Sequence, residues 1–287
     1  MDLKSILPLI PSMIEAKISI IDILKPFLKG HGYNIPQAME KKIKEYEKDK
    51  KAKEIIALLK DFMAKERTPR LLKRYISIKG LFEILDTGYL PLCDPKRWED
   101  DDKNDCAALQ AFCRLKGEGT KARVLCFAEG EEVVHHWNTY SNKEDSCCLE
   151  FKDEFLKDLK GIGNKNLLSG FIDYKPLEEI TRTNLKKLIA EGKTDAIPFI
   201  KRRPYECDKE YRVIWYGEGK KVPEKIRLKK GSIRGITLSP HIPDCVRREY
   251  QVEIKKRLEK HYGKEEINVK QAHIMKSEPL ISIFNRL

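Results

Sequence analysis

Three acidic residues stand at every second position before an apolar, aromatic segment: Glu206, Asp208 and Glu210 precede residues 211–217. The two-residue period of a strand sends Tyr211, Val213 and Trp215 to one face and Glu210, Arg212, Ile214 and Tyr216 to the other. The first face has the composition of a protein core. Glu210 and Arg212 share the second face, where they form either an ion pair on the edge of a sheet or the wall of a cleft that holds a substrate.

A second candidate for chemistry is an aromatic pair in residues 135–141, HHWNTYS, which have helical spacing. Trp137 and Tyr140 are three residues apart and lie on one side of the helix, as a flat platform suited to stacking on a nicotinamide or a nucleobase. This spacing is also typical of aromatic residues in a plain core. The adjacent His135 and His136 point about 100° apart, so they do not predict a shared metal ion.

Carboxylates are most concentrated in residues 98–105, WEDDDKND, which contain Glu99, Asp100, Asp101, Asp102 and Asp105. Clustered carboxylates can bind Mg²⁺ or Ca²⁺. The spacing, however, lacks the glycine and the final glutamate of an EF-hand, so we expect a solvated acidic loop and no metal site. Gly-x-Gly-x-x-Gly, Gly-x-Ser-x-Gly and Gly-Lys-Ser/Thr motifs are absent from the sequence, which leaves dinucleotide-fold, hydrolase and P-loop interpretations without support.

The charge balance favours an anionic partner. The chain has 57 Lys and Arg against 45 Asp and Glu, a formal net charge of +12, and the basic residues are spread along its length. A positive surface attracts polyanions, so nucleic acid or a nucleotide is the expected partner. The alternative is an ordinary basic surface with no anionic partner.

The cysteines and the N-terminal segment bear on location. Eight cysteines occur without a Cys-x-x-Cys or Cys-x-x-His pair, and several, such as Cys126 and Cys148, lie in apolar runs, where cysteine behaves as a small hydrophobic residue. We therefore expect reduced thiols and a cytoplasmic protein. The apolar residues 6–28 are interrupted by Pro8, Pro11 and four charged residues, so neither a membrane span nor a signal peptide is predicted.

The apolar pattern divides the chain into two regions. Residues 10–28 and 36–66 repeat apolar side chains at three- and four-residue steps, which predicts a helical extension over residues 1–67. The role that we expect for this extension, regulation or the binding of a partner, does not follow from the period itself. Residues 68–287 are predicted to form one α+β domain with a mixed or antiparallel sheet, because short strands and short helices follow one another without a regular strand–helix–strand rhythm. Extended segments are expected at 71–77, 89–95, 123–128, 146–151, 170–175, 210–217, 225–230, 233–239 and 267–275, and helices at 78–88 (opened by Ser77 and closed by Gly88), 131–141, 152–160, 177–192 and 245–263.

A series of short motifs runs along residues 71–287: KRYIS, TGYL, DPKRWEDD, VLCFAEG, HHWNTYS, CCLEF, IDYK and YECDKEYRVIWY. This order resembles a widespread bacterial family catalogued as a domain of unknown function. Its members show Arg-Tyr, a Trp/Phe-x-Asp loop, Cys-Phe-Ser, Trp-x-x-Tyr and a late Glu-x-Glu-Trp/Tyr-Arg strand. The family is similar to proteins of the ADP-ribosyltransferase fold, some of which are anti-phage toxins that modify nucleic acid, including the RNA-modifying toxin of the CmdTAC system.

The resemblance implies a site for NAD, used as a substrate, with Glu210 as the catalytic glutamate. Arg74 would contact the ribose or diphosphate, and Trp137 and Tyr140 would form walls of the nicotinamide pocket. The implied cofactor-binding residues are Arg74, Tyr75, Trp137, Tyr140 and Arg212. Two positions depart from the family pattern: Ala128 stands where serine is usual, and Asp101 where proline is typical.

We therefore expect an NAD-dependent ADP-ribosyltransferase that acts as a toxin or defence effector. Nucleic acid, with RNA preferred to DNA, is the expected acceptor, and an antitoxin or regulatory protein is a further expected partner. Cleavage of the bond between nicotinamide and ribose passes through an oxocarbenium-like state, which a carboxylate stabilises. The alternatives are a non-catalytic nucleic-acid-binding or toxin-neutralising module, and a metal-dependent nuclease that uses the acidic residues 98–105.

Overall fold

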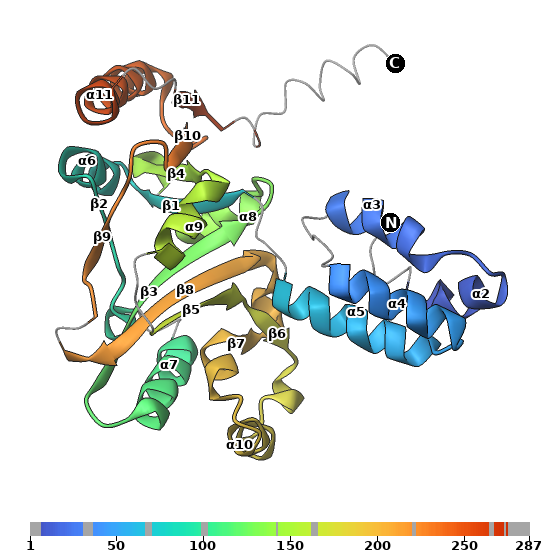
Figure 1. Cartoon of the computed structure of the whole chain (residues 1–287). Helices are drawn as coiled ribbons and strands as arrows, with labels where there is room; N and C mark the ends of the chain where they lie inside the picture. The colour runs from blue at the N-terminus through green and yellow to red at the C-terminus, as the bar shows by residue number, and fades with distance from the viewer. Residues whose placement is uncertain are drawn as a thin grey trace, which may run out of the picture. The chain divides into compact units, whose positions relative to one another are not determined.

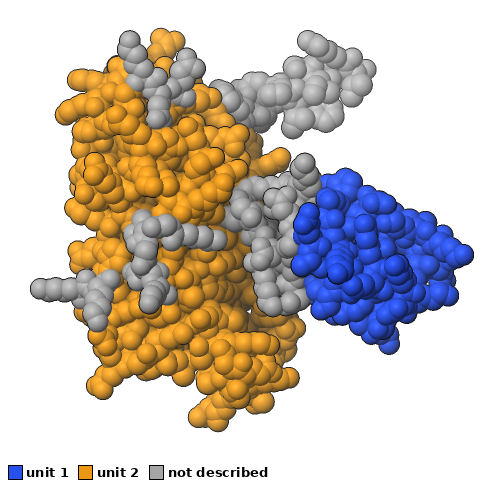
Figure 2. All heavy atoms as spheres, viewed as in Figure 1, with its two compact units in different colours: residues 1–70 blue, residues 71–287 orange. Residues whose placement is uncertain are grey.

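The structure, a computed structural model, describes residues 7–30, 37–66, 71–98, 103–141, 143–161, 166–219, 222–263, 267–272 and 274. The chain forms two compact units, Met1–Arg70 and Leu71–Leu287, which are coloured separately in Figure 2. None of the described helices is long and apolar enough to cross a membrane. All eight cysteines are free thiols.

The first unit consists of helices around a core of its own. Its elements are η1 (Leu7–Leu9), α2 (Ile10–Glu15), α3 (Ile20–Gly30), α4 (Gln37–Lys48) and α5 (Ala52–Glu66) (Figure 1). Their buried residues form one hydrophobic cluster: Leu7, Ile10, Ile14, Ile20, Ile21, Leu24, Met39, Ile43, Ile55 and Leu59.

Each of the two apolar patterns, residues 10–28 and 36–66, is formed by two helices. Each pattern is divided by a turn in which a lysine adopts the left-handed conformation, with φ of 56° at Lys17 and 55° at Lys50. A residue in this conformation ends a helix. The apolar period continues across both turns because the helices on either side contribute to the same core, so the period alone did not reveal the breaks.

The second unit is built on a seven-stranded mixed sheet with the order β11-β10-β4-β1-β3-β8-β5 (Figure 1). Only β10 and β11 are parallel neighbours, and the other adjacent strands are antiparallel. The strands are β1 (Leu72–Ser77), β3 (Thr120–Glu129), β4 (Ser146–Phe151), β5 (Leu167–Phe171), β8 (Glu210–Glu218), β10 (Ile233–Leu238) and β11 (Asn268–Gln271). The α+β class and the mixed sheet are thus confirmed.

The sheet is nearly divided in its middle. Strand β1 pairs with β3 only at Leu72↔Glu129 and Lys73↔Ala128, although both strands are described in full. By contrast, β1 forms five residue pairs with β4, and β3 forms nine with β8. Two ladders, β11-β10-β4-β1 and β3-β8-β5, therefore meet at one corner and separate beyond it.

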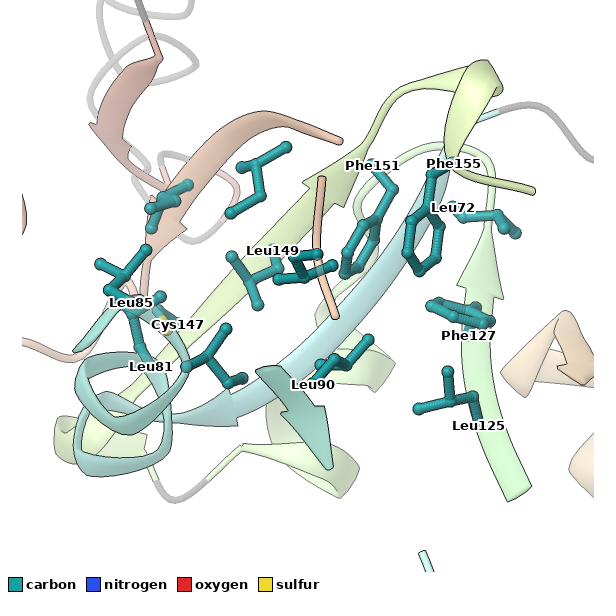
Figure 3. Packing of buried hydrophobic residues seen from close by; sticks show 14 of the residues in the cluster. Leu72, Leu81, Leu85, Leu90, Leu125, Phe127, Cys147, Leu149, Phe151 and Phe155 are labelled. Carbon is teal, nitrogen blue, oxygen red and sulfur yellow. The ribbon is translucent and has the colours of Figure 1, made fainter. Parts of the chain in front are cut away.

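Helices cover both faces of this sheet. One face carries the main core, to which α6 (Ile78–Thr87), α9 (Asp153–Gly161) and α11 (Asp244–Tyr262) contribute. Figure 3 shows Leu81 and Leu85 of α6 near Leu149, and the rings of Phe127, Phe151 and Phe155 grouped at the far end. On the other face, Leu109 of α7 (Lys103–Lys116) packs on Ala122, Val124 and Ile214. The predicted alternation in β8 is confirmed, since Tyr211, Val213 and Trp215 lie in the main core.

The remaining elements are short. Two ribbons pair β2 (Tyr89–Pro91) with β9 (Lys225–Arg227) and β6 (Asp173–Lys175) with β7 (Ile200–Arg202). The other helices are α8 (Val134–Tyr140), α10 (Arg182–Ala190), η2 (Pro95–Arg97), η4 (Lys143–Asp145), η5 (Leu177–Glu179), η6 (Thr194–Phe199) and η7 (Arg203–Asp208).

The interpretation of residues 98–105 as a solvated acidic loop was wrong at Asp105. Helix α7 begins at Lys103, and Asp105 in its first turn is buried. An acidic residue in the first turn is favoured by the helix dipole, and this side chain also has cationic partners inside the protein. Residues 99–102 lie outside the described part of the chain.

The predicted limits of α6 are confirmed. Ser77 is the N-cap, and its hydroxyl accepts a hydrogen bond of 3.0 Å from the backbone N–H of Gly80. Gly88 closes the helix at a φ of 71°, where a side chain would be strained. The caps determine where β1 ends and α6 begins.

Removal of the Ser77 cap is expected to lower the free energy of unfolding of the second unit by about 1 kcal/mol in Ser77→Ala. Lys79→Ala, at an exposed position of the same helix turn, is the control and should change it by less than about 0.5 kcal/mol. Tryptophan fluorescence during urea unfolding measures both, because Trp98, Trp137 and Trp215 all lie in this unit. Equal losses in the two variants would contradict the capping role.

Candidate functional site

A cavity of about 220 Å³ lies where β1 and β3 separate. It is lined by residues from both halves of the sheet, from α7 and α8, and from the segment before β8. The lining comprises Lys73, Arg74, Tyr75, Cys93, Trp98, Asp105, Cys126, Phe127, Ala128, Tyr140, Lys201, Asp208, Glu210 and Arg212. Among the residues predicted from the sequence, the cavity brings together Arg74, Tyr75, Tyr140, Glu210 and Arg212.

The pairing of β3 with β8 explains why there is room beside the charged residues. Glu210 lies opposite Ala128, and Arg212 lies opposite Cys126. Because directly opposed residues of antiparallel strands are close neighbours, two small side chains next to two long ones leave space above the sheet. Ala128 therefore contributes to the cavity by its size.

Arg212 is the centre of a buried charge network. Its side chain is 1% exposed, and its Nε donates to Glu210 Oε1 at 2.7 Å and its Nη2 to Asp105 Oδ2 at 2.9 Å. Nη1 donates to the backbone carbonyl of Pro198 at 2.8 Å. All three guanidinium nitrogens thus have partners, so Arg212 holds Glu210 and Asp105 in place.

Lys201 joins the same network from β7. Its Nζ lies 3.0 Å from Asp208 Oδ2, 3.3 Å from Asp105 Oδ2 and 3.5 Å from Glu210 Oε2. Three carboxylates and two cations, none more than 7% exposed, therefore occupy one buried cluster. Removing charges from water costs several kcal/mol per ion, and mutual pairing offsets this cost only when the geometry is good.

The network keeps Glu210 ionised. Burial by itself raises the pKa of this carboxyl, but the charge and hydrogen bond of Arg212, with the charge of Lys201, outweigh it and lower the pKa from 4.5 to about 2. Burial acts in the opposite direction on Lys201 and lowers its pKa. The negative charges of Glu210, Asp105 and Asp208 outweigh this effect, so the pKa of Lys201 is raised. Both groups stay charged across the physiological range.

Two alternatives were open for Glu210 and Arg212: an ion pair on the edge of a sheet, or the wall of a cleft. The place of β8 in the sheet distinguishes them. Strand β8 lies between β3 and β5, and both side chains are buried and line the cavity. The ion pair between Glu210 and Arg212 is thus present, but it does not lie on an edge strand.

Arg74 reaches the cavity from the opposite half of the sheet. Its Nη1 donates to the backbone carbonyl of Cys126 on β3 at 3.1 Å, and its Nη2 lies 3.4 Å from Cys93 Sγ. Its Nε is buried and has no hydrogen-bond partner in the described residues. Arg74 therefore bridges the separated strands and retains an unused donor.

The aromatic residues divide between core and cavity. Tyr75 lines the cavity and packs edge-on against Trp137, with ring centroids 4.9 Å apart. Trp137 is fully buried among Cys148 and Ala272, donates to Glu132 at 2.7 Å, and is not among the described residues that line the cavity. Tyr140 lines the cavity and is exposed. Trp137 and Tyr140, which were predicted to form one aromatic platform, thus lie in different environments: Trp137 in the core and Tyr140 at the cavity.

Sequence reasoning missed two members of the network, Asp105 and Lys201. Asp105 is remote from Glu210 in the sequence, and Lys201, although only nine residues before Glu210, carries no local signal apart from the short strand β7. Asp208 was noted only as one of the acidic residues that precede the apolar segment, where we had expected it to lie on the loop leading to the strand. It is 3% exposed, and its carboxylate bonds Lys201 and His135, the latter at 2.9 Å. The exposed Glu206, by contrast, fits that expectation.

Comparison of the chain with models of protein families, with curated proteins and with solved structures found no match. The described residues contain no group of three or more His, Cys, Asp or Glu side chains placed to hold a metal ion. The fold and the site define an α+β protein with a small cavity where its sheet divides. In this cavity the ionised carboxylate of Glu210 is bound by Arg212.

Replacement of Arg212 by methionine should lower the free energy of unfolding by about 3–5 kcal/mol, because two buried carboxylates lose their partner. The matched control is Arg123→Met, which breaks a partly exposed 2.8 Å pair with Asp94 and should cost no more than about 1 kcal/mol. Urea unfolding followed by tryptophan fluorescence measures the difference. Similar losses in both variants would show that burial adds nothing to the pairing of Arg212.

The lowered pKa of Glu210 predicts a pH dependence of stability. A depressed carboxyl pKa stabilises the folded state above the unfolded pKa of 4.5, and this contribution is lost as the pH falls toward about 2. Between pH 5 and pH 3 the wild type should lose about 2 kcal/mol that Glu210→Gln does not lose. Urea titrations of both proteins at the two pH values test this, with the exposed Glu206→Gln as the control. Parallel losses in wild type and Glu210→Gln would contradict it.

Proposed function

We propose that the second unit is an ADP-ribosyltransferase that takes NAD as a substrate, with Glu210 as the catalytic residue. The observation that carries the proposal is the buried, ionised carboxylate of Glu210 in a cavity that Arg74 enters from the other half of the sheet. The divided mixed sheet supports an arrangement similar to the ADP-ribosyltransferase fold.

We propose that the residues around the cavity bind one end of NAD. At about 220 Å³ the cavity is smaller than the roughly 300–1,000 Å³ of sites that enclose a whole drug-sized ligand. It would enclose the nicotinamide riboside end, between Tyr75 and Tyr140. Arg74, which lines the cavity, would bind the diphosphate by charge-assisted hydrogen bonds.

Glu210 would act through its charge. As the bond between nicotinamide and ribose breaks, positive charge develops on the ribose, and a fixed carboxylate in a water-poor cavity stabilises that charge without having to reorganise. Arg212 and Lys201 hold the carboxylate in position and in the ionised state. Arg212 is therefore proposed as a positioning residue, and Trp137 supports Tyr75 from the core.

The acceptor we propose is nucleic acid, with RNA favoured, because the formal net charge of +12 attracts polyanions. A role as a toxin or defence effector, with the helical first unit as the part that binds an antitoxin or regulatory protein, belongs to the same proposal. The nuclease alternative is less well supported. Asp105, the one described carboxylate of residues 98–105, is bound to Arg212 and Lys201.

Incubation of the full-length protein with NAD labelled in its adenylate part, together with separate pools of total RNA, DNA and cell protein, tests the function. We expect nicotinamide release and label in one pool, with the rate lowered about 10²–10³-fold in Glu210→Gln. Glu206→Gln, an exposed glutamate on the preceding turn, should retain the wild-type rate.

The proposal fails if the wild type releases no nicotinamide and labels no pool, or if Glu210→Gln is as active as the wild type. Salt-sensitive binding of RNA or DNA without use of NAD would instead indicate a non-catalytic nucleic-acid-binding module.

A further inference from the structure

A histidine and an aspartate form a hydrogen-bonded pair beside the cavity. Nε2 of His135 lies 2.9 Å from Oδ1 of Asp208, and the second carboxylate oxygen of Asp208 lies 3.0 Å from Lys201 Nζ. The side chain of Asp208 is 3% exposed, whereas that of His135 is 40% exposed. A buried, fully bonded carboxylate therefore holds an imidazole that solvent can reach.

This contact determines which nitrogen of His135 is free. An ionised carboxylate only accepts hydrogen bonds, so Nε2 must carry the proton that it donates to Asp208. In the neutral imidazole the basic lone pair then lies on Nδ1. Nδ1 lies 3.4 Å from the hydroxyl of Thr139, a long contact on the exposed side of α8. Nδ1 is thus a base open to an incoming molecule.

The neighbouring histidine has a different environment. His136 is fully buried, and its Nε2 lies 3.0 Å from the backbone carbonyl of Asp208. Burial lowers the pKa of His136, which favours the neutral form. Both histidines bond residue 208, but only His135 faces solvent.

His135 is not itself a lining residue of the cavity that we propose for NAD, but it contacts two residues that are. Asp208 and Tyr140 line that cavity, and His135 bonds the first and stacks edge-on at 6.3 Å with the second. Besides Thr139, the groups that contact its ring are Asp208 of η7, with Lys201 of β7 behind it, and His136 and Tyr140 of α8. Through Lys201 the pair is connected to Glu210.

Glu210 is poorly suited to accept a proton itself. Its oxygens face Arg212 at 2.7 Å and Lys201 at 3.5 Å, and a carboxylate so stabilised in the ionised form is a weak base. A transfer reaction to a hydroxyl or amino group still releases a proton. An imidazole suits this task because its ordinary pKa lies near the working pH.

We infer that His135, oriented by Asp208, is the general base that deprotonates the nucleophile of the acceptor; the inference rests on the proposed function. The acceptor oxygen or nitrogen forms a bond to C1′ of the ribose, and the bond from C1′ to the nicotinamide nitrogen breaks. The bonding pair goes to nicotinamide, which leaves neutral, and the proton of the nucleophile goes to Nδ1 of His135. Asp208 is a positioning residue that stabilises the resulting imidazolium.

The test measures nicotinamide release to water, which is itself an acceptor, and transfer to whichever pool of RNA, DNA or protein takes up label. In His135→Gln both rates should fall about 10²–10⁴-fold at neutral pH, with KM for NAD unchanged. The acid limb of the wild-type pH–rate profile should disappear. In His135→Ala, added imidazole should restore part of the rate. The control, His261→Gln on the distant helix α11, should match the wild type.

The outcomes separate this inference from the function on which it rests. Wild-type turnover of NAD that depends on Glu210 but is unchanged in His135→Gln overturns the inference alone. A slow His135→Gln variant that keeps the acid limb, together with no rescue of His135→Ala by imidazole, shows a structural role and also overturns it. Absence of NAD turnover in the wild type overturns both proposals.

Discussion

The burial of five charges around Arg212 is the interaction on which the rest of the second unit depends. A carboxylate from α7, one from η7 and one from the start of β8 converge on a guanidinium and an ammonium, with all five side chains nearly out of contact with water. Such a cluster is tolerated only when each charge has its partner within hydrogen-bonding distance. The position of α7 over β3 and β8, and the path of residues 194–208 before β8, therefore involve electrostatic pairing as well as apolar contact.

This constraint also explains how much could be predicted from the sequence. The alternation along β8 and the caps of α6 follow from residues adjacent in the chain, and both were predicted correctly. Asp105 is 107 residues from the arginine that binds it, and no local pattern connects the two. A cluster assembled from four separate elements is visible only after the chain has folded. The local signal at residues 98–105 was in fact misleading, because an acidic run resembles a solvated loop even when one member turns inward.

Helix α8 illustrates the same limit at closer range. The spacing of Trp137 and Tyr140 correctly predicted a helix, but it gives the side of the helix on which a residue lies and not its depth. In the folded chain Trp137 closes a small core with Cys148 and Ala272, while Tyr140, one turn later, reaches the cavity. His135 and His136 separate in the same way. The mixed sheet could be predicted from the irregular succession of short strands and helices in the sequence, whereas its division between β1 and β3 could not.

Because the ladder between β1 and β3 is short, backbone pairing joins the two halves of the sheet, β11-β10-β4-β1 and β3-β8-β5, at one corner. A small change in the angle between these two halves would break none of the ladder hydrogen bonds within either half. It would change the width of the cavity between Arg74 and Glu210. A molecule bound by both side chains would join the two halves where backbone pairing is absent, in addition to the hydrogen bond from Arg74 to the carbonyl of Cys126. Ligand binding and the association of the two halves of the sheet would then be linked equilibria, and each would stabilise the other by the same free energy.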